Sequence, residues 1–173
     1  MQDSVDANLN TPKLESTQQT ESESNDLVAK AKNSVRRSAF NLLARREHSL
    51  SELKKKLGQK YSDSTLIDSV LQDLIAEGLQ SDERFVESFV NAQVQRQRGP
   101  MKIAYDLRQK QVNDELIQSA LCNFSDQWVE IATALVEKKY GFEPPEDLKE
   151  KQRRMRFVMQ RGFPADICYR LFD

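Results

Sequence analysis

Glycine and proline are scarce in this chain of 173 residues, which has five of each. Few positions are therefore suited to the tight turns and bends on which β-rich folds depend. Residues whose straight side chains lose little rotamer freedom in a helix are abundant instead. We predict an all-α fold, and the length suits one ordinary domain or several small helical units with a continuous core.

Cysteine and histidine are rarer still, with two copies and one. Cys122 and Cys168 lie far apart within apolar helical patterns, which fits neither a metal site nor a disulfide framework, so we expect two buried thiols. His48 has no cysteine or second histidine nearby, and a capping or packing role is favoured over a metal site. No Gly-rich phosphate loop, nucleophile elbow or His-Glu-x-x-His motif occurs, so the sequence predicts neither an enzyme nor a cofactor.

A strong excess of one charge is also lacking, because the net charge is −1. Residues 1–33 hold six acidic and three basic residues, which leaves 23 basic and 21 acidic residues in the remainder. This surplus is too small to predict tight autonomous DNA binding, although clustered cations can still follow a phosphate backbone. The sequence opens with no signal-peptide pattern and has no apolar run long enough for a membrane span, so we expect a cytoplasmic protein.

The pattern along the chain predicts a tail and three helical units. Residues 1–27 are polar with few large apolar side chains, so we predict that they are disordered. The units are expected at residues 28–79, 80–124 and 125–173, each with three amphipathic helices. The predicted N-caps are Ser49, in a capping box with Glu52, then Ser62 or Asp63, Ser81, and Asn113 or Asp114.

Apolar positions recur along the chain at a spacing of 50 residues. The matching columns are Phe40, Val90 and Tyr140, then Leu57, Leu107 and Phe157, then Ile67, Ile117 and Ile167, then Leu71, Leu121 and Leu171. Agreement at equivalent helix positions predicts three tandem three-helix repeats. One such unit buries too little surface alone, so we expect the repeats to stack into an elongated, curved body. Trp128 is expected in the core.

Several segments of the sequence resemble the RecX family of RecA modulators. They are residues 39–49 (AFNLLARREHS) with Glu52 and Leu53, residues 81–89 (SDERFVESF), residues 98–110 (RGPMKIAYDLRQK) and residues 159–163 (MQRGF). Each segment is a weak signal by itself, but their order and spacing together are specific. Gln111 departs from the family pattern, which commonly has glycine there, so this glutamine must accept a helix-ending conformation or extend the helix.

The resemblance implies both a fold and a partner. The implied fold is again three tandem three-helix repeats, and the implied partner is the filament that RecA forms on single-stranded DNA. Members of the family lodge in the groove of this filament, hinder its extension or promote its loss, and lower strand exchange, ATP hydrolysis and repressor cleavage. We therefore expect a monomeric, non-enzymatic modulator of RecA, chiefly an inhibitor, that regulates recombination, DNA repair and the SOS response.

Basic residues gather before or on the second helix of each unit. If the repeats stack in register, these helices lie along one face and form a cationic surface for phosphates or an acidic filament wall. We call this candidate RecA-filament and DNA site the basic strip, and it comprises Arg45, Arg46, Lys54, Lys55, Lys56, Arg96, Arg98, Lys102, Arg108, Lys110, Arg153, Arg154 and Arg156. For any single cluster, an ordinary solvated helix face is the simpler alternative.

Two other functions compete with this interpretation. Residues 49–79 read as helix, turn, helix, which is typical of winged-helix DNA-binding regulators. Such a domain must supply a β-hairpin wing after Leu79, whereas Ser81 to Phe85 predicts a helix cap and an amphipathic helix. The second alternative is a helical protein–protein adaptor with no RecA-related activity.

Overall fold

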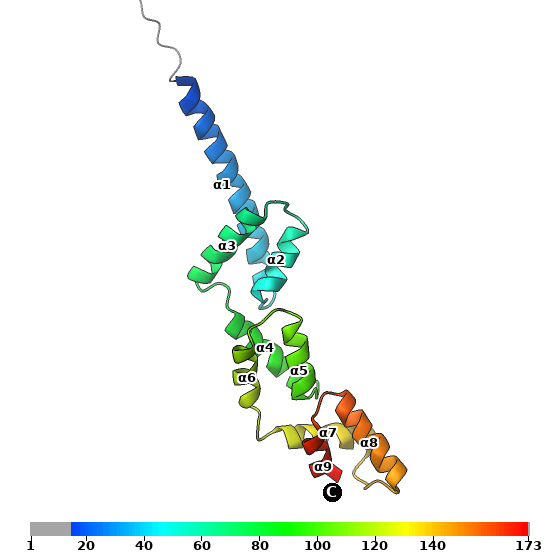
Figure 1. The fold of residues 1–173 in the computed structure, drawn as a ribbon. Coiled ribbons are helices and arrows are strands. Elements are labelled where there is room, and N and C mark those ends of the chain that lie inside the picture. Colours follow the sequence, from blue (N-terminus) through cyan, green and yellow to red (C-terminus); the bar gives the residue numbers. More distant parts are fainter. Residues whose placement is uncertain (1–14, 173) are drawn as a thin grey trace, which may run out of the picture.

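The fold is an elongated array of helices, described here from a computed structural model that covers residues 15–172, with side chains from residue 25 onward. Nine helices and no strand occur in this part of the chain (Figure 1). They are α1 (Glu15–Leu43), α2 (Leu50–Gly58), α3 (Ser64–Ala76), α4 (Asp82–Gln95), α5 (Pro100–Arg108), α6 (Asp114–Cys122), α7 (Trp128–Tyr140), α8 (Leu148–Gln160) and α9 (Ala165–Phe172). The all-α prediction is confirmed.

Successive trios of helices pack together as three units placed end to end. Repeat 1 contains α1, α2 and α3, repeat 2 contains α4, α5 and α6, and repeat 3 contains α7, α8 and α9. After repeat 1, Ser81 caps α4 by accepting a hydrogen bond from the Arg84 backbone N–H. No hairpin wing follows Leu79 in the described chain, so the winged-helix alternative is wrong.

Polar side chains begin the helices where the sequence predicts them. Asp63 accepts from the Leu66 N–H, and Asn113 accepts from the Glu115 N–H. Ser49 accepts from the Glu52 N–H, but only this half of the predicted capping box is seen. The Glu52 carboxylate instead contacts the side chains of His48, Arg46 and Lys110.

The start of α1 differs from the prediction. A disordered tail was expected up to residue 27, but α1 begins at Glu15, while residues 1–14 lie outside the described residues. Residues 25–31 are exposed, so tertiary packing does not hold this part of the helix. Extending an existing helix costs little, because each added residue contributes one hydrogen bond. The packed segment around Val35 and Ala39 supplies that existing helix.

The apolar side chains form two clusters instead of one continuous core. The first lies within repeat 1 and contains Val35, Ala39, Leu53, Leu57, Ile67, Val70, Leu71 and Leu74. The second runs through repeats 2 and 3 and includes Trp128, whose predicted core position is confirmed. The residues of the column Ile67, Ile117 and Ile167 are all buried. Phe40, which recurs with Val90 and Tyr140 in the 50-residue pattern, is 53% exposed, and the buried residues of α1 are Val35 and Ala39.

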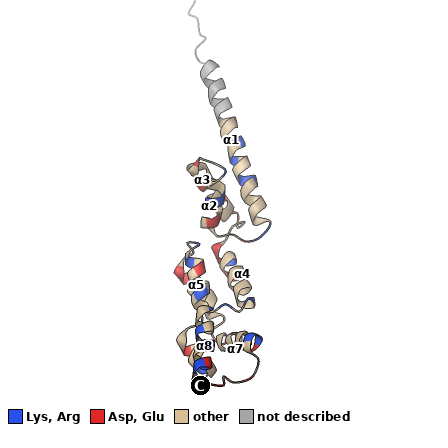
Figure 2. Cartoon of the chain, turned by 90° about the vertical axis from the view of Figure 1, so that its right-hand side faces the viewer, with Lys and Arg blue, Asp and Glu red and all other residues tan. Residues whose placement is uncertain are grey.

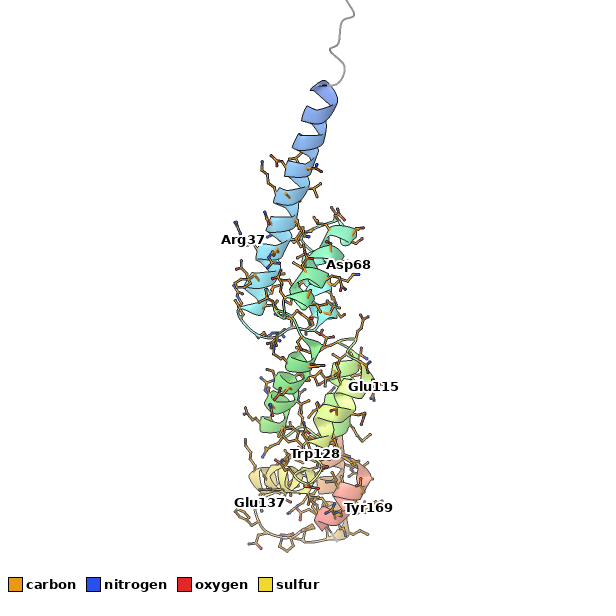
Figure 3. All side chains as sticks on the ribbon, turned by 90° about the vertical axis from the view of Figure 1, so that its left-hand side faces the viewer. Arg37, Asp68, Glu115, Trp128, Glu137 and Tyr169 are labelled. Carbon is orange, nitrogen blue, oxygen red and sulfur yellow. The ribbon has the colours of Figure 1, made fainter. Side chains whose placement is uncertain are left out.

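Repeats 2 and 3 are joined by a close backbone contact. The Gly99 N–H donates to the Arg161 carbonyl at 2.8 Å, and the Met101 N–H donates to the Gly162 carbonyl at 3.0 Å. A Cβ on Gly99 would lie 2.3 Å from the Gly162 carbonyl carbon. Beside this contact, Trp128 and Phe163 meet edge to face with ring centroids 6.4 Å apart. Figure 3 shows Trp128 at the level where repeat 2 meets repeat 3.

The structure places three residues for which the sequence made a prediction, namely Gln111, Cys122 and Cys168. Gln111 has a φ of +57°, so this glutamine adopts the left-handed, helix-ending conformation. Cys168 is buried, and burial raises the pKa of its thiol. Cys122 is exposed at the C-terminal end of α6, so the prediction of two buried thiols is wrong for this residue, because Ile117 and Leu121 take the buried positions of this helix.

Candidate binding surface

The second helices of the three repeats lie on the same side of the body. Figure 1 shows α2, α5 and α8 along one edge, and Figure 2 views the molecule from that edge. In this ribbon view, positions of Lys and Arg (blue) occur along all three helices, with positions of Asp and Glu (red) among them. The stacking therefore places on one side the three helices that carry most of the predicted basic strip, but this side is not uniformly cationic.

In repeat 1 the cations of the strip fall into paired and open positions. Lys54 pairs with Asp68 at 2.7 Å, and Arg46 pairs with Glu52 at 3.1 Å. Lys55 and Lys56 are exposed in the last turn of α2 and line a cleft of about 300 Å³ between α2 and the end of α5. Arg45 is exposed in the turn after α1. A partner's anions can bind exposed cations of this kind without displacing an acidic side chain of the same chain.

In repeat 2 most strip cations are held by acidic neighbours. Asp106 lies 3.0 Å from both Arg98 and Lys102, and Arg108 pairs with Asp114 at 2.7 Å. Arg96 is exposed at the end of α4. Solvent-exposed ion pairs contribute roughly 0–1 kcal/mol each. The paired cations of this segment can therefore exchange their acidic neighbours for a partner's anions at small cost.

Lys110 is more firmly placed than the other strip cations of repeat 2. Its Nζ contacts the Glu52 carboxylate of repeat 1 and lies 5.6 Å from the centroid of the Phe89 ring. The lysine therefore bridges two repeats, and its charge is largely neutralised within the molecule.

In repeat 3 one of the three predicted strip residues is not on the surface. Arg153 and Arg156 are exposed, whereas Arg154 is only 5% exposed. Arg154 donates to the Glu150 carboxylate at 2.9 Å and to the Glu143 carbonyl at 2.7 Å. It thus ties the 141–147 loop to α8, and we remove it from the basic strip. The burial of Arg154 could not be predicted from its position in the helix, because it depends on the path of the 141–147 loop.

Replacing Arg154 by methionine tests this structural role. The change keeps an apolar stem but removes the hydrogen bonds to Glu150 and to the Glu143 carbonyl, and we expect the free energy of unfolding in urea to fall by about 2 kcal/mol. Arg156→Met on the same helix is the matched control, with an expected change within about 0.5 kcal/mol because this side chain is exposed. Equal losses in the two variants would contradict the assignment.

His48 and Glu52 form a buried polar pair beside the strip. His48 is 3% exposed, and its Nδ1 lies 3.0 Å from the Glu52 carboxylate. Burial lowers the pKa of His48, and this effect outweighs the hydrogen bond with Glu52, which favours protonation. Burial by itself would raise the pKa of Glu52, but hydrogen bonds with Lys110 and His48 outweigh it and lower that pKa. His48 is therefore a packed, hydrogen-bonded side chain, in agreement with the predicted capping or packing role.

Exposed apolar side chains also lie on this side and were not part of the predicted strip. Met101 is 60% exposed and Tyr105 is 54% exposed, and the two residues are one turn apart on α5. The buried face of α5 carries Ile103, Ala104 and Leu107 instead. The signal was present in the sequence, since positions 101 and 105 fall outside the apolar stripe of a helix that starts at Pro100.

Within residues 25–172, whose side chains the structure describes, no three His, Cys, Asp or Glu side chains gather as a metal site would require. Of the described helices, none is apolar over enough residues to span a bilayer.

Comparison with known proteins identifies the family. Models of the first, second and third three-helix domains of RecX match residues 36–74, 81–121 and 125–172. A regulatory protein RecX of Halorhodospira halophila is 40% identical over 136 residues, which cover 79% of this chain and 84% of the relative. One of Pseudomonas savastanoi pv. phaseolicola is 39% identical over 139 residues, with coverage of 80% and 90%.

A solved structure agrees in fold. The crystal structure of RecX from Lactobacillus salivarius superimposes with a TM-score of 0.73 and 23% identity, over 83% of this chain and 95% of the other. The three domain models account for each repeat in order, and the relatives match over most of both chains. The chain therefore belongs to the RecX family of regulatory proteins.

Proposed function

We propose that this chain regulates the RecA recombinase by lying in the groove of the RecA filament on single-stranded DNA. The observation that carries the proposal is the position of α2, α5 and α8 on one side of an elongated three-repeat body. An extended surface of this kind suits a partner that is itself extended. Membership of the RecX family supports RecA as that partner.

The proposed contact surface is the basic strip without Arg154. Its exposed cations attract phosphates or acidic protein side chains over a distance of about 10 Å at moderate ionic strength. Attraction of this kind speeds encounter and sets the orientation of the partner more than it sets affinity. Met101 and Tyr105 supply apolar contacts among these cations.

The proposed mechanism is steric occupancy. A body that bridges several RecA protomers changes the filament only if it binds one assembly state better than another. Slower filament growth and faster filament loss are both consistent with this principle. The proposal includes a monomeric, non-enzymatic protein that acts in the cytoplasm, where RecA meets DNA, and lowers recombination and the SOS response.

Charge reversal in repeat 1 tests the surface. We expect Lys54→Glu, Lys55→Glu and Lys56→Glu together to weaken binding to RecA on single-stranded DNA about tenfold or more at moderate salt, because the change removes attraction and adds repulsion. Helix content should not change, since all three side chains are exposed. Fluorescence anisotropy of the labelled chain, titrated with preformed filament, measures the affinity.

The matched control reverses three exposed cations that lie off the second helices, namely Lys30, Arg37 and Lys138. This control should lose much less affinity than the α2 variant and carries the same change in net charge. Equal binding by wild type and the α2 variant would remove this cluster from the interface. A helical adaptor unrelated to RecA predicts that even the wild-type chain fails to bind.

A further inference from the structure

The contact between repeats 1 and 2 differs in chemistry from the contact between repeats 2 and 3. The apolar cluster of repeat 1 is separate from the cluster that repeats 2 and 3 share. Apolar burial therefore stabilises each side of the first contact but does not continue across it. At the second contact, the core and two closely packed glycines hold the repeats together.

Hydrogen bonds and ion pairs make the first contact. The Leu50 N–H donates to Asp82 at 2.8 Å, and the Ser49 hydroxyl donates to the Lys110 carbonyl at 3.2 Å. Arg84 pairs with Glu47 at 2.9 Å. With the contact between Glu52 and Lys110, these bonds connect the start of α2 to the start of α4 and the end of α5. We call this set of residues the polar joint, and it comprises Glu47, His48, Ser49, Leu50, Glu52, Gln80, Asp82, Arg84 and Lys110.

Three members of the polar joint are buried polar side chains. His48, Ser49 and Gln80 are 3%, 0% and 4% exposed, and Gln80 donates to the Asp82 carboxylate at 2.8 Å. Each buried hydrogen bond contributes only about 0.5–1.5 kcal/mol net, because water replaces it when the contact opens. Exposed apolar side chains gain no comparable interaction with water, so opening an apolar contact loses its full burial free energy. The polar joint should therefore open at a lower free energy than the contact between repeats 2 and 3.

The charges of the joint make its opening depend on salt and pH. Glu52 is faced by His48, Arg46 and Lys110, and Lys55 and Lys56 line the same cleft. Elsewhere in the joint, Asp82 accepts from Gln80, and Arg84 pairs with Glu47. The lowered pKa of Glu52 means that its pairing stabilises the joint at neutral pH and is lost as pH falls through that pKa. The lowered pKa of His48 means that acid favours states in which its ring reaches water. Both groups favour opening in acid, but His48 acts below its ordinary pKa of 6.5, whereas Glu52 acts only below its ordinary pKa of 4.5.

From this contrast we infer that the polar joint is a hinge, about which repeat 1 moves as one unit while repeats 2 and 3 stay rigid. Salt and acid favour the open arrangement. The hinge would let repeat 1 engage or leave a partner independently of the other repeats. This inference concerns the free protein and does not depend on RecA as the partner.

Distance measurements between spin labels test the hinge. In a Cys122→Ser, Cys168→Ala background, one variant carries cysteines at the exposed positions Gln72 and Gln118, on either side of the joint. The matched control carries them at exposed Gln118 and Gln152, across the contact between repeats 2 and 3. Pulsed electron–electron double resonance gives the distance distribution for each pair of spin labels.

We expect the width of the Gln72–Gln118 distribution to increase about twofold or more when NaCl is raised from about 0.05 M to about 1 M. Lowering the pH from about 7.5 to about 5 should also broaden it, through protonation of His48 in the open arrangement. Glu52→Gln should cause the same broadening at low salt and neutral pH. The Gln118–Gln152 distribution should stay constant, which also reports that these variants remain folded. A cross-joint distribution that stays as narrow as the control under all these conditions would overturn the hinge.

Discussion

Gly99→Ala is expected to lower the free energy of unfolding by about 3 kcal/mol, because the added methyl group collides with backbone. The new Cβ would lie 2.3 Å from both the carbonyl carbon and oxygen of Gly162 and 2.4 Å from the Phe163 nitrogen. No side chain can rotate away to relieve these contacts. The repeats must separate, and separation breaks the hydrogen bond from the Gly99 N–H to the Arg161 carbonyl.

Gly58→Ala is the matched control for this substitution. No heavy atom lies within 4 Å of a Cβ built on Gly58, and alanine is a better helix former by about 1 kcal/mol. This variant should be as stable as wild type or slightly more stable. Urea unfolding followed by circular dichroism measures both, and a Gly99→Ala variant as stable as Gly58→Ala would contradict the close contact.

Phe163→Ala should have the second large effect, and it should be confined to one part of the molecule. Phe163 is buried in the core shared by repeats 2 and 3, where its ring meets Trp128. Loss of a buried phenylalanine side chain costs about 3–5 kcal/mol. Because the core of repeat 1 is separate, hydrogen exchange should quicken in α4 to α9 and remain nearly unchanged in α3.

Leu53→Ala is the reciprocal change, since Leu53 is fully buried in the repeat 1 core. It should cost about 2–5 kcal/mol and quicken exchange in α2 and α3, while the helices of repeats 2 and 3 stay protected. Hydrogen exchange followed by mass spectrometry distinguishes the two patterns. Uniform loss of protection along the chain in both variants would show one cooperative core and contradict the division described above.

Helix starts and equivalent buried positions of this fold can be predicted from the sequence. Caps such as Ser81 and Asn113 occur where the helices begin, because a short polar side chain must satisfy the first free N–H groups. The recurrence of Ile67, Ile117 and Ile167 marks equivalent buried positions, since the third helix of each repeat buries the same face. These features depend on near neighbours in the chain, so a sequence pattern reveals them.

What the sequence does not reveal depends on contacts between distant segments. Arg154 looks like any exposed cation of α8, and only the path of the 141–147 loop buries it. The separation of the cores depends on which side chains face repeat 2, and polar Ser49 and Gln80 fill those places. Phe40 fits the 50-residue column, yet the position of α1 against α3 buries Val35 and Ala39 instead. Periodicity predicts helix faces but not how the repeats dock.

Hydrolysis of ATP by RecA on single-stranded DNA, titrated with this protein, tests the proposed function most directly. If the body occupies the filament groove across several protomers, the rate should fall at amounts well below one chain per RecA protomer. The α2 charge-reversal variant should require more protein for the same effect. A rate that stays constant up to equimolar wild-type protein would contradict regulation of RecA through the filament.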